Sequence, residues 1–421
     1  MIKTYFKQAW AMMQRNKLFS SMYILGTAIT IALVMVLFII FYIKLGPVYP
    51  EYNRDRMVYL ENIYFNINNG NNSGGTGVSR EVLHRLAREV DNFEQMAISS
   101  IDTHSKGMIE GVKRSDPMFT CNNFWNLYDF EFICGKGYTL EQVNNNRVKP
   151  VVVLCESLSR KLFATTDAVG KTVNINDIEH KVVGVVKDVS GSTPNVYAQY
   201  WVPVNTPLSS EGKRGGENML GNYKMVFLAK DKGSVADVKK QISEVLTRMM
   251  SEQPEGNRYE PMIQTHAQYV LGDKYNENIG NIILIFAALL FIPALNLCGM
   301  IASRMNSRLE EVGVRKAFGA TNRQLVFQVL CENLLFTAIG ALLGFILSCL
   351  FAKLSQEWIV TLLDSYVDID APTTVSMEMM LNPTILSITV LLVFILNIVS
   401  ALVPTIYSLR HSITVSLNVK K

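Results

Sequence analysis

The stretch KLFSSMYILGTAITIALVMVLFIIFYIK, which runs from Lys17 to Lys44, decides the architecture of this chain. No charged residue lies between its two lysines, and a helix of this length crosses a bilayer core of ~30 Å. A secretory signal would have a shorter apolar core, roughly 7–15 residues, followed by a cleavage site of small residues. We therefore expect a retained spanning helix over residues 18–44, after a short amphipathic segment at 1–17.

Three further uncharged stretches are long enough to span a membrane, at residues 278–303, 333–352 and 379–409. The stretch 333–352 is the shortest, and a buried helix of a soluble core is the alternative interpretation for any one of them. Only 18% of the residues are charged, against roughly 25% in soluble proteins, and 49% are hydrophobic. The sequence therefore predicts four transmembrane helices.

The charges of the connecting segments set the direction of the spans. Basic residues dominate segments 1–17, 304–332 and 410–421, whereas segment 353–378 is acidic. The positive-inside rule then predicts that both termini lie in the cytoplasm and that residues 45–277 lie outside the inner membrane. The net charge of +4 is too small to indicate a nucleic-acid partner. The apolar spans make the lipid bilayer the expected surroundings.

The outer segment has the patterns of a mixed α/β domain. Alternation predicts a strand over Met57–Asn68, and the glycine-rich stretch 68–77 predicts a mobile loop. Further expected elements are a helix from Ser79 to Val90, strands at 95–101, 107–112, 150–154 and 223–229, a helix at 157–163, a hairpin over 172–186, and a helix with a capping box at Ser234–Asp237. We expect two subdomains, one discontinuous (53–113 and 223–265) and one inserted (114–222).

Cysteines and histidines of the outer segment indicate little chemistry. Cys121, Cys134 and Cys155 allow at most one disulfide, and Cys121–Cys134 is the closest pair in sequence, so that bridge is left open. The outer histidines lack the spacing of a metal site, so we expect no metal, no cofactor and no catalytic residue in this chain.

Residues Ser307–Thr321, SRLEEVGVRKAFGAT, carry the most specific motif of the chain. They resemble the signature of the FtsX-like permease family of ABC systems, which has Arg-Glu-Ile-Gly, two further residues, and Lys-Ala-Leu-Gly-Ala-Thr. Residues 150–163, 169–172 and 182–188 resemble the periplasmic core domain of MacB-like permeases. The resemblance covers nearly the whole chain and implies a membrane α-helical protein with an α/β (α+β) MacB-like core domain outside.

The resemblance also implies partners. It implies a homodimer that works with two copies of a cytoplasmic ABC ATPase, which would bind the ATP. Because only about 17 residues precede the first span, we expect that ATPase to be a separate polypeptide. A periplasmic adaptor or an outer-membrane protein is a further candidate partner.

The cytoplasmic loop 304–332 is the expected contact with the ATPase. We expect Gly313 to interrupt the helix that continues from the second span, because glycine costs about 1 kcal/mol relative to alanine. Gly319 should then cap a short helix over 314–318. The alternative is that the loop cations only contact lipid phosphates. The residues assigned to coupling are Glu310, Glu311, Val312, Gly313, Arg315, Lys316, Gly319 and Ala320.

Gly340 and Gly344 form a GxxxG pair in the third span, which lets two helices approach closely. This pair could serve the contact between two copies or the packing within one subunit. The expected mechanism is mechanotransmission, in which ATP-driven motion reaches the outer domain for export or extraction of an envelope substrate. The alternatives are an FtsX-type regulator that activates a cell-wall hydrolase and a membrane-anchored enzyme.

Overall fold

The computed structural model describes residues 10–11, 13–14, 17–67, 72–100, 107–109, 112–115, 117–144, 150–204, 219–272, 275–306, 309–354 and 383–409. These residues form two compact units. Among the described residues, one unit, the outer unit, extends from Ile43 to Tyr275, and the other, the helical unit, contains those up to Tyr42 and those from Asn276 on. Residues 355–382 and 410–421, with most of the acidic loop and the tail, lie outside the described residues.

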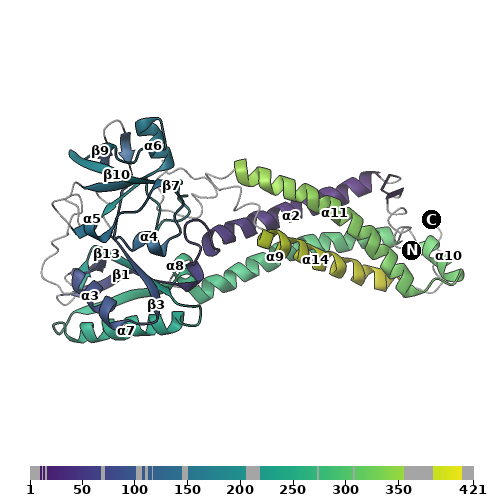
Figure 1. Ribbon diagram of the computed structural model, residues 1–421. Coiled ribbons are helices and arrows are strands. Elements are labelled where there is room, and N and C mark those ends of the chain that lie inside the picture. The colour runs from purple at the N-terminus through teal and green to yellow at the C-terminus, as the bar shows by residue number, and fades with distance from the viewer. Residues whose placement is uncertain are drawn as a thin grey trace. The chain divides into compact units, whose positions relative to one another are not determined.

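The helical unit is built from long helices (Figure 1). They are α2 (Lys17–Leu45), α9 (Tyr275–Asn306), α10 (Leu309–Ala317), α11 (Asn322–Leu354) and α14 (Pro383–Leu409). By length and composition, three segments among the described residues could cross a membrane: Ser20–Leu45, Asn322–Leu354 and Leu386–Tyr407. The remaining predicted span, 278–303, is the second along the chain and lies within α9, a helix of 32 residues.

The outer unit contains a mixed sheet with helices packed against it (Figure 1). Its strands are β1 (Met57–Ile67), β2 (Asn72–Val78), β3 (Phe93–Ser100), β4 (Gly107–Ile109), β5 (Val112–Ser115), β6 (Pro117–Thr120), β7 (Phe132–Gly135), β8 (Val151–Cys155), β9 (Thr172–Ile175), β10 (Ile178–Val186), β11 (Tyr200–Pro203), β12 (Leu220–Gly221), β13 (Tyr223–Ala229) and β14 (Arg258–Thr265). Its helices are η1 (Arg54–Arg56), α3 (Arg80–Glu89), α4 (Phe124–Leu127), α5 (Leu140–Asn144), α6 (Glu156–Phe163), α7 (Val235–Ser251) and α8 (His266–Leu271).

The strands follow the order β12-β2-β1-β13-β3-β6-β11-β8-β10-β9-β4-β5, with β14 beside β1 and β7 beside β10. The β8–β10 and β6–β11 pairs are parallel, and the other strand pairs among the described residues are antiparallel. All five residues of β8 are buried, which matches its uninterrupted apolar sequence. On α7, buried residues recur at helical spacing, at Val238, Ile242, Val245, Leu246 and Met249.

The strands of both predicted subdomains belong to this one sheet path, and two separate hydrophobic clusters pack on it. One strand pairs across the predicted subdomain boundary. On the sequence alone, the residues of β4 are assigned to the discontinuous subdomain, 53–113 and 223–265. In the structure, Ile109 of β4 pairs with Ile175 of β9, a strand of the inserted segment. A three-residue strand carries too little pattern to reveal its neighbour, so the sequence could not place it.

The glycine-rich stretch was wrongly predicted as a loop from residue 72 on, because β2 pairs with β1 there. Gly74 and Gly75 lie opposite Phe65 and Tyr64, and a Cβ at Gly75 would lie 3.0 Å from the Tyr64 ring. Aromatic rings that cover glycines compensate for their low strand propensity. Cys121 and Cys134 are both free thiols, so the disulfide that the sequence left open is absent from the structure.

Candidate functional site

The candidate site is the turn between α10 and α11. The helix α10 before this turn is continuous through Gly313. Gly313 lies inside α10 and is buried, so the predicted break at this residue was wrong. Val312 beside it packs against the cluster of Tyr23, Phe336 and their neighbours. This packing compensates for the propensity cost of about 1 kcal/mol that motivated the prediction.

The end of α10 is fixed by a Schellman motif around Gly319. The Ala320 N–H donates to the Arg315 carbonyl at 3.0 Å, and the Gly319 N–H donates to the Lys316 carbonyl at 3.0 Å. Gly319 has a φ of 88°, the left-handed conformation that this motif requires and that glycine adopts without strain. The structure thus places Gly319 at the helix end, as expected from the sequence.

Thr321 begins the next helix, and sequence reasoning missed it. Its Oγ1 accepts from the Gln324 N–H at 3.4 Å, and its own N–H donates to Gln324 Oε1 at 3.0 Å. This reciprocal pair is a capping box, and the Thr-x-x-Gln spacing was visible in the sequence. Only Ala320 separates the two caps, so the reversal between α10 and α11 is held on both sides.

A polar chain connects α10 to α11. Arg315 Nη1 donates to Gln328 Oε1 at 2.6 Å, and Gln328 Nε2 donates to Glu332 Oε1 at 3.0 Å. The Glu332 residue is only 1% exposed and Gln328 only 7% exposed. Hydrogen bonds between buried polar groups hold both helices in one geometry, because breaking one would leave a buried group unsatisfied. Gln328 and Glu332 were missed, although their i, i+4 spacing places them on one face of α11.

Two apolar side chains at the end of α10 and in the turn after it are exposed. Phe318 is 88% exposed and Val314 is 46% exposed. An exposed aromatic side chain on a rigid turn is the kind of residue that anchors a protein interface. Of the other predicted coupling residues, Arg315, Lys316 and Ala320 are half-buried, and the side chains of Glu310 and Glu311 lie outside the described part of the chain.

Gly340 and Gly344 on α11 lie against α2 of the same chain. A Cβ at Gly340 would lie 2.9 Å from Thr27 Cβ, and one at Gly344 would lie 2.7 Å from the Ala28 carbonyl oxygen. The stripe of buried residues on α11 continues through Ser348 to Ala352, at four-residue spacing. This contact favours packing within one subunit over the contact between copies.

No group of three metal-ligating side chains occurs within the described ranges. His180 is buried in β10, and its Nδ1 lies 2.9 Å from the Ile178 carbonyl oxygen. Burial lowers the pKa of His180, which keeps its imidazole neutral.

Comparison with known proteins matches both units. Residues 20–245 match the MacB-like periplasmic core domain, and residues 283–417 match the FtsX-like permease C-terminal family. The chain is 22% identical over 229 residues to the macrolide export ATP-binding/permease protein MacB of Bdellovibrio bacteriovorus, which covers 53% of this chain and 34% of that protein. It is 24% identical over 225 residues to the ABC transporter permease YknZ of Bacillus subtilis, which covers 53% of each.

A third relative, MacB of Aggregatibacter actinomycetemcomitans, is 25% identical over 297 residues, covering 66% of this chain and 43% of that protein. The matches therefore span between about a third and about half of these relatives' lengths. Among solved structures, the periplasmic region of MacB from Actinobacillus actinomycetemcomitans has a TM-score of 0.35 at 16% identity, covering 54% of this chain and 93% of that one. A permease domain from Porphyromonas gingivalis has a TM-score of 0.39 at 18% identity, covering 51% and 90%.

Proposed function

The chain belongs to the MacB-like and FtsX-like family of ABC transporter permeases, and we propose that it couples ATP hydrolysis by an ABC ATPase to movement of its outer unit. The ATP would be bound by the ATPase and not by this chain. We further propose a homodimer with two ATPase copies. The observation that carries the proposal is the rigid α10–α11 turn, which presents Phe318 on its exposed side.

The topology that we propose has four spans, at 18–44, 278–303, 333–352 and 379–409. The three apolar helices support it, and so does α9, whose 32 residues exceed the length that a bilayer requires. The basic segments that flank the spans favour both termini and the α10–α11 turn in the cytoplasm of the inner membrane. The outer unit would then lie in the periplasm.

In this arrangement Phe318 and Val314 would seat in an apolar groove of the ATPase. Movement of the ATPase would displace α10. The hydrogen bonds Arg315–Gln328 and Gln328–Glu332 would make α11 move together with α10. We propose that the cargo is an envelope substrate handled outside the membrane, by export or extraction. The relatives that are named for macrolide export support this class over activation of a cell-wall hydrolase.

The test is Phe318→Ala in the full chain, reconstituted in lipid nanodiscs with the ATPase that co-purifies with it. Loss of an interface anchor typically costs about 2 kcal/mol, so the dissociation constant of the ATPase should rise roughly 30-fold. The matched control is Leu140→Ala, which removes an apolar side chain that is 58% exposed on the outer unit and should leave binding unchanged. Equal ATPase affinity in both variants would refute the proposed contact.

A further inference from the structure

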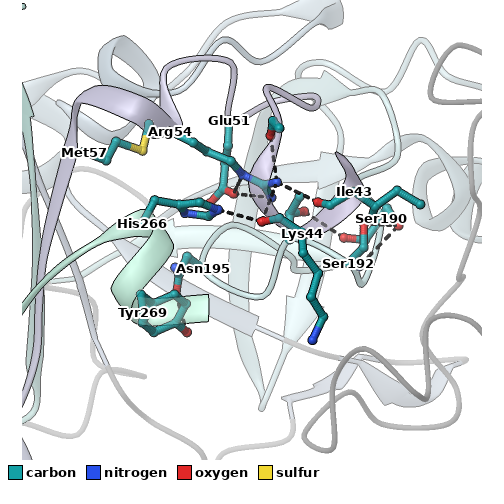
Figure 2. Close-up of polar contacts among 12 residues, drawn as sticks. Ile43, Lys44, Glu51, Arg54, Met57, Ser190, Ser192, Asn195, His266 and Tyr269 are labelled. Atoms are coloured by element: carbon teal, nitrogen blue, oxygen red, sulfur yellow. Dashed lines mark hydrogen bonds and ion pairs between the residues drawn. The ribbon is translucent and has the colours of Figure 1, made fainter. Parts of the chain in front are cut away.

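The end of α2 in the outer unit is capped by one arginine. The last carbonyls of a helix have no partner within it. Here Arg54 Nη1 lies 2.7 Å from the Ile43 carbonyl oxygen, 3.0 Å from that of Gly46 and 3.4 Å from that of Lys44 (Figure 2). The guanidinium therefore holds the last turn of α2 and the chain that leaves it, at the end of the helix dipole that favours a cation.

Glu51 fixes the orientation of this arginine. Its Oε2 accepts from Arg54 Nε at 2.7 Å and lies 2.7 Å from Nη2, so the carboxylate occupies one edge of the guanidinium while Nη1 faces the carbonyls. The two side chains are only 2% and 1% exposed. A buried ion pair of this kind resists rearrangement, because separating its members would leave an unpaired charge out of water.

His266 brings in the segment by which the chain leaves the outer unit. It is the first residue of α8, and the Thr265–Gln268 capping box fixes its backbone. Its Nε2 lies 2.8 Å from the Lys44 carbonyl oxygen, which can only accept, so Nε2 carries the hydrogen. In the neutral ring Nδ1 then accepts from the Tyr59 hydroxyl, 3.1 Å away. Figure 2 shows Arg54 and His266 directed at the same turn of α2.

Neighbouring residues of Arg54 and His266 bond to segments that are far away in sequence. On the entry side, Arg56 donates to the Ala229 and Lys230 carbonyls at 3.1 and 2.8 Å, at the end of β13. On the exit side, the Tyr269 hydroxyl donates to Asn195 Oδ1 at 3.1 Å. The entry and exit segments of the outer unit are thus bonded to one helix end, to the end of β13 and to the segment between β10 and β11.

We propose that Glu51, Arg54 and His266, together the α2 joint, are positioning residues that transmit displacement of α2 into the outer unit. Without them, segment 46–53 would absorb the displacement by bending, because a helix end without capping contacts can fray and the chain beyond it can change direction. The inference rests on the proposed function, since the motion to be transmitted is the one driven by ATP. The proposal does not require Glu51, Arg54 or His266 to contact a cargo.

The experiment uses the full chain with its co-purified ATPase in nanodiscs, with spin labels introduced as non-natural amino acids. Labels at Leu33 of α2 and Lys161 of α6 report the rigidity between helix and outer unit. Labels at position 161 alone report the distance between two copies, with and without a non-hydrolysable ATP analogue. In the unsubstituted chain we expect a narrow 33–161 distribution and an ATP-dependent shift in the 161–161 distance.

Arg54→Met and His266→Leu should broaden the 33–161 distribution and reduce the 161–161 shift at least twofold, while ATP hydrolysis stays within twofold. His266→Gln keeps a donor toward Lys44 and should restore the shift. Arg85→Met, which removes an exposed salt bridge with Glu252, is the control and should change neither distance.

The variants His266→Leu and His266→Gln keep the proposal testable if Arg54→Met fails to fold. His266 makes a single hydrogen bond to the end of α2, and its replacement leaves the buried Glu51–Arg54 pair in place. A full shift in His266→Leu would overturn the role of the joint. Absence of any ATP-dependent shift in the unsubstituted chain would instead overturn the proposed function. A merely structural role would lower the melting temperature of His266→Leu without changing the 161–161 shift that the ATP analogue produces, and this outcome too would overturn the proposal.

Discussion

Replacing Gly344 by alanine tests whether α2 and α11 pack closely within one chain. The new methyl group would lie 2.7 Å from the Ala28 carbonyl oxygen and 2.9 Å from Ile31 Cβ. Ordinary carbon contacts are about 3.5–4.0 Å, so the helices must separate by roughly 0.5–1 Å at this point. The nearest atom belongs to the backbone and cannot rotate away, so overpacking should cost about 1–3 kcal/mol.

The gain in helix propensity from glycine to alanine, about 1 kcal/mol, offsets part of this cost. The net destabilisation of Gly344→Ala should therefore be roughly 0–2 kcal/mol, which is about 1–3 kcal/mol worse than the propensity gain alone would give. Gly280→Ala is the matched control, because no atom lies within 4 Å of a Cβ built on Gly280, so it should be neutral or slightly stabilising. Reversible unfolding of the full chain in mixed micelles measures both variants.

The same variants distinguish the two roles considered for the GxxxG pair. If Gly344 served the contact between copies, Gly344→Ala would shift the monomer–dimer equilibrium, counted by single-molecule photobleaching, and leave monomer unfolding unchanged. That result, or equal unfolding of Gly344→Ala and Gly280→Ala, would refute packing of Gly344 against α2.

Two further predictions concern the outer unit. Burial, with the charge of Arg54 as a second cause, lowers the pKa of His266 from 6.5 to about 4. The unfolded chain therefore takes up this proton at higher pH than the folded chain, so stability is full above pH 6.5 and falls by roughly 3 kcal/mol as the pH drops to 4. Denaturant titrations across this range should show the slope in the unsubstituted chain and a reduced slope in His266→Gln; equal slopes would contradict the assignment. Ser79→Ala should lower the free energy of unfolding by about 1 kcal/mol in the same titration, because Ser79 Oγ accepts from the Val82 N–H at 3.2 Å. Asn123→Ala is the control and should cost less, since Asn123 makes no side-chain cap bond. Equal losses in the two variants would count against the capping role of Ser79.

Local periodicity predicted the elements whose pattern is long. The alternation in Met57–Asn68 became β1, and the apolar run at 150–154 became β8 followed by α6. Ser79 caps α3, as its sequence pattern indicated. In each case the residues that define the element lie within one segment, so no distant contact was needed to place it.

The predictions failed in two ways, by choosing the wrong local cap and by lacking the contacts between distant segments. Ser234 makes no cap bond with the α7 backbone, and Asp231 Oδ1 instead accepts from the Ser234 N–H and hydroxyl. Capping boxes lie instead at Thr139, Thr265 and Thr321, whose partners are glutamines. Arg54 and His266 are too far apart in sequence for any local pattern to connect them, so the α2 joint could only be found in the structure.

The proposed transmission pathway includes two places where hydrogen bonds hold the chain, the α10–α11 turn and the end of α2. Mainly small residues and aliphatic side chains pack α11 against α2, with a weak hydrogen bond from the Ser348 hydroxyl to Met35 Sδ at 3.6 Å. Dispersion contacts of this kind tolerate sliding because they are not directional. At the α10–α11 turn and at the end of α2, hydrogen bonds with defined donors and acceptors hold the chain instead. A helix transmits displacement along its axis only if the chain at its end does not bend, because the stiffness of the helix is otherwise lost in the loop. In the proposed mechanism, the buried charged groups at these two places keep the chain from bending. Stability alone would not explain them, since a well-packed apolar replacement is often at least as stable as a buried ion pair.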